Sequence, residues 1–203
     1  MKTRSIEPVS LRGGIAIQDP LQAVSGYLES WRFEVGDASS SFGESDLRLA
    51  NRGGARISAA EIAATLERRR AIELALQTIA PDVSLAGAGR LVPWQPLGQL
   101  FDAFADIRGI GLSKMTKALH PKRPALVPML DSVVQAYLHA DEPEAPSASF
   151  GERATALVRG YKRDLDRNHP ALRELRRELA AHGYRATEVR VLDLLIWSAL
   201  AKR

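Results

Sequence analysis

The chain contains no cysteine in its 203 residues. This absence excludes disulfide bonds, thiolate zinc sites, iron–sulfur clusters and cysteine nucleophiles. No run of about eighteen uncharged apolar residues is present either, which a membrane-spanning helix would need. Residues 1–8 lack the apolar stretch of a signal peptide. We therefore expect a cytoplasmic protein that does not enter membranes.

Aromatic residues are scarce, at 6% of the chain, and the four histidines are scattered without the spacing of metal ligands. We expect neither a metal ion nor an organic cofactor. The glycine-containing stretches at 43–46 and 87–89 lack the lysine and the strand of a phosphate-binding loop, so no nucleotide cofactor is expected. Some aromatic side chains could stack on a displaced base, although a place in the core is the simpler interpretation: Trp31, Phe42, Trp94 and Tyr137.

Apolar residues recur at helical spacing, whereas apolar–polar alternation is nearly absent, which predicts an all-α fold. A hydrophobic content of 45% with 26% charged residues is typical of globular proteins. We interpret residues 1–57 as an N-terminal region that packs on a helical domain of residues 58–203. In that domain, Ser58 and Glu61 form a capping box that starts a helix. Helices are expected at residues 58–79, 147–166, 170–182 and 187–201.

Positive charge is concentrated in one short segment. The formal net charge is +4. Residues 107–123 carry five basic residues and no acid, so this segment is +5 and the rest of the chain sums to −1. Such a cluster is typical of contact with a polyanion. The five are Arg108, Lys114, Lys117, Lys122 and Arg123, and His120, within the same segment, could touch phosphate or lie at the surface.

The sequence Ile-Arg-Gly-Ile-Gly at residues 107–111 predicts a tight turn between two packed helices, a helix-hairpin-helix element over about residues 97–119. Glycine at positions 109 and 111 permits unusual backbone angles and close approach of another group. The free amides at the start of the next helix, together with the helix dipole, bind an anion such as a DNA phosphate. The expected contacts to duplex DNA are Arg108, Gly109, Ile110, Gly111, Ser113, Lys114, Lys117, Lys122 and Arg123.

These features, followed by a proline-bearing loop and by Asp131 at the start of the next helix, resemble the HhH-GPD superfamily of base-excision DNA glycosylases. The resemblance covers about residues 100–138, and Asp131 lies 22 residues after Gly109, as in that superfamily. It implies a helical DNA-binding enzyme that hydrolyses the N-glycosidic bond of a damaged or modified base. Asp131 would stabilise the cationic sugar and direct a water.

The chain departs from the pattern of the superfamily at three points. Ser113 stands where strand-cleaving members carry the lysine that forms a Schiff base, so only monofunctional base excision is expected. Arg108 replaces the usual proline, and the cysteine cluster of some members is missing.

Two other interpretations remain open. The chain could be a non-catalytic helix-hairpin-helix protein that binds DNA in the nucleoid, in which Asp131 only caps its helix. It could also be a helical interaction module, in which the basic segment is a solvated surface.

Overall fold

The computed structural model describes residues 6–28, 38–87, 91–141 and 147–201. Most of these residues are helical, and the two strands are short: β1 (Val9–Ser10) pairs antiparallel with β2 (Ala16–Ile17). The predicted all-α class is confirmed. In this part of the chain, no helix is both long and apolar enough to cross a membrane.

The described residues form α-helices along the whole chain. In chain order they are α1 (Pro20–Ser25), α2 (Glu44–Arg52), α3 (Ala59–Glu67), α4 (Arg69–Gln77), α5 (Trp94–Asp102), α6 (Leu112–Leu119), α7 (Ser132–Leu138), α8 (Phe150–Arg167), α9 (His169–Ala181) and α10 (Glu188–Leu200). The described residues also form the short 3-10 turns η1 (Arg12–Gly14), η3 (His120–Lys122) and η4 (His139–Asp141).

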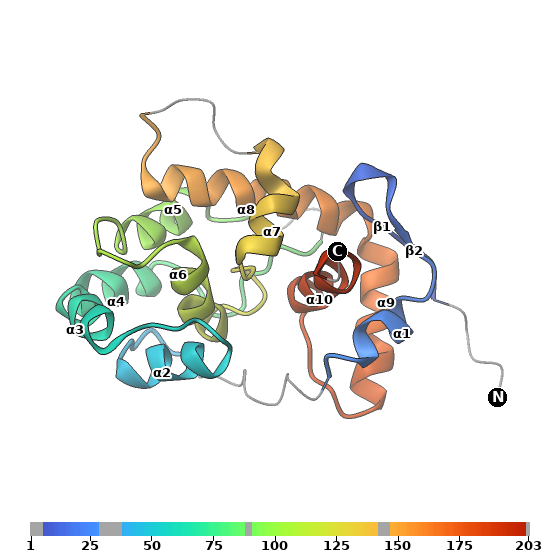
Figure 1. Cartoon of the computed structure of the whole chain (residues 1–203), viewed down its shortest axis with the longest axis horizontal. Coiled ribbons are helices and arrows are strands. Elements are labelled where there is room, and N and C mark those ends of the chain that lie inside the picture. The colour runs from blue at the N-terminus through green and yellow to red at the C-terminus, as the bar shows by residue number, and fades with distance from the viewer. Residues whose placement is uncertain (1–5, 29–37, 88–90, 142–146, 202–203) are drawn as a thin grey trace.

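Helices α2 to α6 gather at one side of the molecule, whereas the strands, α1, α9 and α10 gather at the other (Figure 1). Helices α7 and α8 lie between these groups and join them. The described residues before position 57 are divided between the two sides, because α1 packs on α10 whereas α2 packs on α6 and α3. Buried apolar residues from both sides form one continuous core.

Local capping signals define several helix starts. The predicted capping box is present, because the Glu61 amide donates to Ser58 Oγ and the Ser58 amide donates to Glu61 Oε2. An equivalent box between Ser149 and Glu152 starts α8 at Phe150, a few residues later than expected. Capping thus fixes where α3 and α8 begin.

The single helix expected over residues 58–79 is wrong, because the chain breaks at Arg68 into α3 and α4. The physical reason is the phase of the apolar residues. At 100° per residue, Ile62 and Leu66 point about a quarter turn away from Ile72 and Leu76. One straight helix could not bury both pairs on the same neighbours, whereas the break allows Ile72 and Leu76 to be fully buried.

A buried ionic cluster holds the N-terminal hairpin against the centre of the molecule. The Arg12 side chain donates to Asp164 Oδ2 at 2.6 Å and to the Gly160 carbonyl at 2.8 Å, and it also pairs with Asp141. The Ser10 amide donates to Asn168 Oδ1 at 2.8 Å. These bonds fix η1 beside α7 and α8.

Candidate nucleic-acid interface

The glycine turn, defined as residues 107–111, joins α5 to α6 (Figure 1). Ile107 and Ile110 are buried, and the Ile110 amide donates to the Ile107 carbonyl at 3.0 Å. Gly109 and Gly111 are exposed. Gly109 has φ +87°, in the left-handed region that favours glycine. The turn therefore has an apolar inner side and a backbone that is open to a partner.

Helix α6 begins with free amides. Its N-cap is Gly111, whose φ of −93° and ψ of −176° suit any residue. No side chain of the described residues caps this end, so the amides of Leu112 and Ser113 donate to no side chain. Together with the helix dipole they form a positively polarised end that can accept an anion. Of the two glycines, only Gly109 depends on the backbone freedom of glycine.

Glu61 of α3 lies against the glycine turn, which the sequence did not predict. Lys114 Nζ donates to both of its carboxylate oxygens, at 2.7 and 2.8 Å. A Cβ atom at Gly109 would lie 2.1 Å from Glu61 Oε1. The hydrogen bond from Lys114, and then that from the Ser58 amide, lower the pKa of Glu61. The turn thus carries its own carboxylate, which neutralises one of the predicted DNA-binding lysines.

Other cations lie in the turn and beside α6. Arg108 is exposed, and Lys117 is half-buried on α6. A Cβ atom at Gly54 would lie 3.9 Å from Lys117 Nζ, which places the loop after α2 beside α6. Arg52 at the end of α2 and Arg56 in this loop are both exposed. The sequence did not predict these two arginines as contacts, because the packing of α2 against α6 arises only in the fold.

Lys122 and Arg123 do not face solvent, so this part of the predicted interface is wrong. Lys122 Nζ lies 2.9 Å from Asp46 Oδ1 and its side chain is 2% exposed. Arg123 is fully buried and donates to the carbonyls of Leu76 and Ile79 at the end of α4, at 2.8 and 2.9 Å. A cation is favourable there, because the last carbonyls of a helix lack partners within it. Both charges serve the fold.

The other aromatic and histidine candidates are mostly structural. Phe42 is 1% exposed and packs edge-on against Phe104. Trp94 is half-buried and Tyr137 is buried, whereas Trp31 lies outside the described residues. His120 is buried too, with Nδ1 at 2.7 Å from the carbonyl of Val127, so it touches no phosphate.

Asp131 caps α7, as the sequence predicts. Its Oδ1 accepts from the amides of Val133 and Val134, at 3.0 and 3.1 Å. Its Oδ2 accepts from Trp197 Nε1 of α10 at 2.6 Å, and the residue is 7% exposed. Both carboxylate oxygens are therefore engaged by groups that hold α7 against α10. The Trp197 contact was not predicted from the sequence.

The start of α7 is also tied to α6. The Leu130 amide donates to Thr116 Oγ1 at 3.0 Å, and Gln135 Nε2 donates to the Leu130 carbonyl at 2.6 Å. Asp131 follows directly, so the fold brings it beside the helix that the glycine turn introduces.

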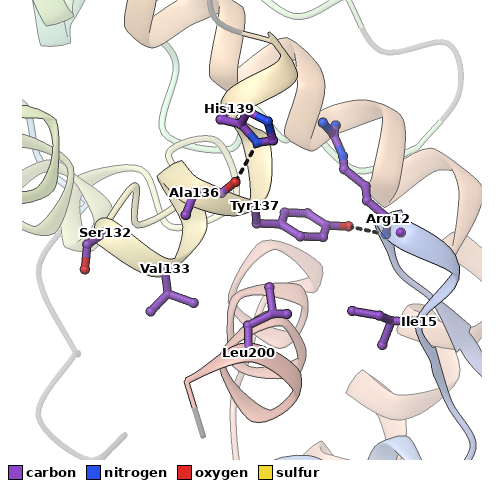
Figure 2. Close-up of a pocket in the computed structure, with 9 residues that line it drawn as sticks. Arg12, Ile15, Ser132, Val133, Ala136, Tyr137, His139 and Leu200 are labelled. Carbon is purple, nitrogen blue, oxygen red and sulfur yellow. Dashed lines mark hydrogen bonds between the residues drawn. The ribbon is translucent and has the colours of Figure 1, made fainter. Parts of the chain in front are cut away.

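A cleft of about 530 Å³ lies along α7, between the end of α10 and the N-terminal hairpin. Figure 2 shows its apolar side chains, with Val133, Leu200 and Ile15 around the ring of Tyr137. The Tyr137 hydroxyl accepts from the Arg12 amide at 3.1 Å. The lining includes the two residues that follow Asp131 but not Asp131 itself.

Two buried titratable groups flank the start of α7. Asp193 of α10 accepts from the Tyr161 hydroxyl at 2.9 Å and from the Met129 amide at 3.3 Å. Burial, with a contribution from the nearby charge of Asp131, raises the pKa of Asp193 to about 7. Burial also lowers the pKa of His120 to about 4. At pH 5 to 6, the folded protein therefore holds a proton on Asp193 and none on His120.

Comparison with known proteins gives one match. A family model described as a family of unknown function (DUF6308) matches residues 32–200. The comparisons with curated proteins and with solved structures found no match.

We predict that Asp193 and His120 change the free energy of unfolding in opposite directions as the pH rises from about 5 to 6.5. The folded pKa of Asp193 is raised, so its contribution falls as pH rises through this range. The folded pKa of His120 is lowered, so its contribution rises with pH. Each residue changes the free energy of unfolding by at most about 1.4 kcal/mol per pH unit, and the two changes largely cancel in the parent protein.

The measurement is the free energy of unfolding by urea at several pH values in this range. Asp193→Asn should leave a stability that increases with pH, and His120→Gln should leave one that decreases. Parallel pH profiles for the two variants would contradict the assignment.

Proposed function

The chain belongs to the family of unknown function DUF6308, and we propose that it is a DNA-binding protein that holds the phosphate backbone of duplex DNA at the glycine turn. The observation that carries this proposal is the combination of an exposed turn, a buried apolar inner side and an uncapped start of α6. A phosphate oxygen placed there would accept hydrogen bonds from the Leu112 and Ser113 amides. Such contacts position DNA without reading its sequence.

The surrounding charges support the proposal. Arg108 lies in the turn and Lys117 lies further along α6, while Arg52 at the end of α2 and Arg56 in the loop after it extend the basic surface beside Lys117. Each cation that meets a phosphate releases condensed counterions, so binding depends strongly on salt. Lys114 joins this surface only in part, because Glu61 neutralises it.

The resemblance to the HhH-GPD superfamily supports the same interpretation. The glycine turn, the proline-bearing loop and the capping aspartate follow one another in the order that the superfamily uses. We propose that residues 94–119 act as a helix-hairpin-helix element.

Base excision is a second candidate function. The cleft along α7 favours it, because this cleft is large enough for a base, contains an aromatic ring and begins one residue after Asp131. The contacts of Asp131 favour the non-catalytic alternative, because both carboxylate oxygens already accept hydrogen bonds within the protein. Non-catalytic DNA binding is therefore the function that the geometry supports best.

We predict that charge changes around the turn alter DNA affinity in opposite directions. Lys117→Gln and Arg108→Gln should each weaken binding several-fold and reduce the slope of log affinity against log salt by about one. Glu61→Gln should strengthen binding, because it removes a negative charge beside the phosphate and leaves Lys114 free. A glutamine at this position still supports the capping box.

The assay is fluorescence anisotropy of a labelled duplex of arbitrary sequence, measured over a series of salt concentrations. Arg173→Gln, which removes an exposed arginine from α9, is the matched control and should bind like the parent. Equal affinities for the Glu61, Lys117 and Arg173 variants would exclude the turn as the binding surface.

The two glycines should respond differently to substitution. Gly111→Val should keep the fold, because the backbone at this residue is ordinary and nothing lies within 4 Å of the position that a Cβ atom would take. It should still lose about tenfold or more in DNA affinity, since the side chain separates phosphate from the amides. Gly109→Val should destabilise the protein, because it meets both a positive φ and Glu61.

Circular dichroism, thermal unfolding and anisotropy on the same samples separate these effects. A folded Gly111→Val variant with the affinity of the parent would refute phosphate binding at this turn.

A panel of duplexes that carry damaged bases, with detection of released base, tests the second candidate. We expect no release, because Asp131 is fully engaged. If base is released, Asp131→Asn should abolish the release, and borohydride should trap no adduct because Ser113 offers no amine. Asp131→Asn should also lower the free energy of unfolding by about 1–3 kcal/mol. Asparagine has one oxygen and one NH2 group, so in one orientation its NH2 group meets the Trp197 donor and in the other it meets the capping amides of α7. Base release by the parent protein would replace the non-catalytic assignment with the enzymatic one.

A further inference from the structure

The loop after α2, residues 53–57, is held firmly against the rest of the fold. The Asn51 side chain bonds to both backbone groups of Ile57, because its Nδ2 donates to the Ile57 carbonyl at 2.9 Å and its Oδ1 accepts from the Ile57 amide at 2.6 Å. Ala55 and Ile57 are buried, whereas Arg56 between them is exposed. The backbone is therefore anchored on both sides of Arg56, and its side chain is left at the surface.

Arg56 adopts a backbone conformation that is unusual for its residue type. Its φ is +55°, in the left-handed region that favours glycine. In the part of the chain that the structure describes, Asp106 is the other residue besides glycine with a positive φ. In this region the Cβ atom crowds the following carbonyl oxygen, so glycine would be more stable at position 56. Strain of this kind concentrates at functional positions, which points to a role of the arginine other than folding.

Lys117 of α6 reaches the same loop. A Cβ atom at Gly54, two residues before Arg56, would lie 3.9 Å from Lys117 Nζ. Among the described residues, Arg56 and Lys117 pair with no carboxylate, whereas Lys114 pairs with Glu61. An anion that contacts both cations would be attracted by each of them. Gly53 and Gly54 are exposed and carry no side chain, so the loop leaves room for such an anion beside Lys117.

We propose that Arg56 and Lys117 together hold a second phosphate of the duplex whose first phosphate lies at the glycine turn. This inference rests on the proposed function and extends it. Lys117 lies four residues after Ser113, which is about 6 Å along the axis of α6. Helix α6 would thus carry one phosphate at its start and another further along. A ligand must then present at least two phosphates on one backbone, as a nucleic acid does and inorganic phosphate does not.

The first experiment uses the strain at Arg56. Arg56→Gly should raise the melting temperature by a few degrees, yet weaken duplex binding several-fold and lower the slope of log affinity against log salt by about one. Asp106→Gly is the matched control, because it relieves strain of the same kind without removing a cation, and it should not weaken binding. An Arg56→Gly variant that binds duplex like the parent, or that melts at a lower temperature, would overturn the proposal.

Combined substitutions test whether both cations meet one phosphate. The double variant Arg56→Gln/Lys117→Gln should lose less affinity than the product of the two single losses, because both residues act on the same phosphate. Arg56→Gln/Gly111→Val should lose close to the product, because these residues act on different phosphates. A full product of losses for the first pair would exclude a shared phosphate.

The outcomes also separate this inference from the proposed function. If Gly111→Val weakens duplex binding and Arg56→Gln does not, the second phosphate is excluded and the glycine turn keeps its role. If the parent protein binds no duplex at low salt, both proposals are refuted.

Discussion

The buried guanidinium of Arg123 is the interaction on which the arrangement around the glycine turn depends. It donates to the carbonyls of Leu76 and Ile79 at the end of α4 and to the carbonyl of Ala38 in the loop before α2. Its own backbone directly follows η3, which continues from α6. One side chain thus fixes α4, the 38–40 loop and the far end of α6 in relation to one another. Loss of the guanidinium would leave these buried carbonyls without a donor, at a cost of about 1–3 kcal/mol for each one.

This constraint decides which of the clustered cations can reach a ligand. Arg123 and Lys122 are held inside by carbonyls and by Asp46, and Lys114 is paired with Glu61. Arg108 is exposed and Lys117 is half-buried, and the fold adds Arg52 from the end of α2 and Arg56 from the loop after it. The resulting basic surface therefore consists partly of other residues than the basic run along the sequence.

Local features of the sequence predicted much of the fold. Helical periodicity, the Ser58–Glu61 capping box and the cap at Asp131 depend on residues within a few positions of each other, and all three are present. The burial of Ile107 and Ile110 beneath an exposed turn follows from the same local pattern. The proposed site could therefore be located from the sequence.

The remaining features depend on distant residues and could not be predicted from one sequence. Glu61 and Lys114 are 53 positions apart, and Asp131 and Trp197 are 66 positions apart. Nothing in the local pattern around Glu61 distinguishes a carboxylate that only caps α3 from one that also reaches the glycine turn. Similarly, a lysine–arginine pair in a proline-bearing loop suggests exposure, and only the end of α4 explains why Arg123 is buried.

Phosphate binding at the glycine turn is tested best by an NMR titration of the isotope-labelled protein with a short duplex of arbitrary sequence at low salt. We expect the backbone amides of Gly111, Leu112 and Ser113 to show the largest shifts, and these shifts to fade as salt is added. Duplex binding that leaves these three amides unchanged and moves signals elsewhere would contradict phosphate binding there, and so would the absence of any shift at low salt.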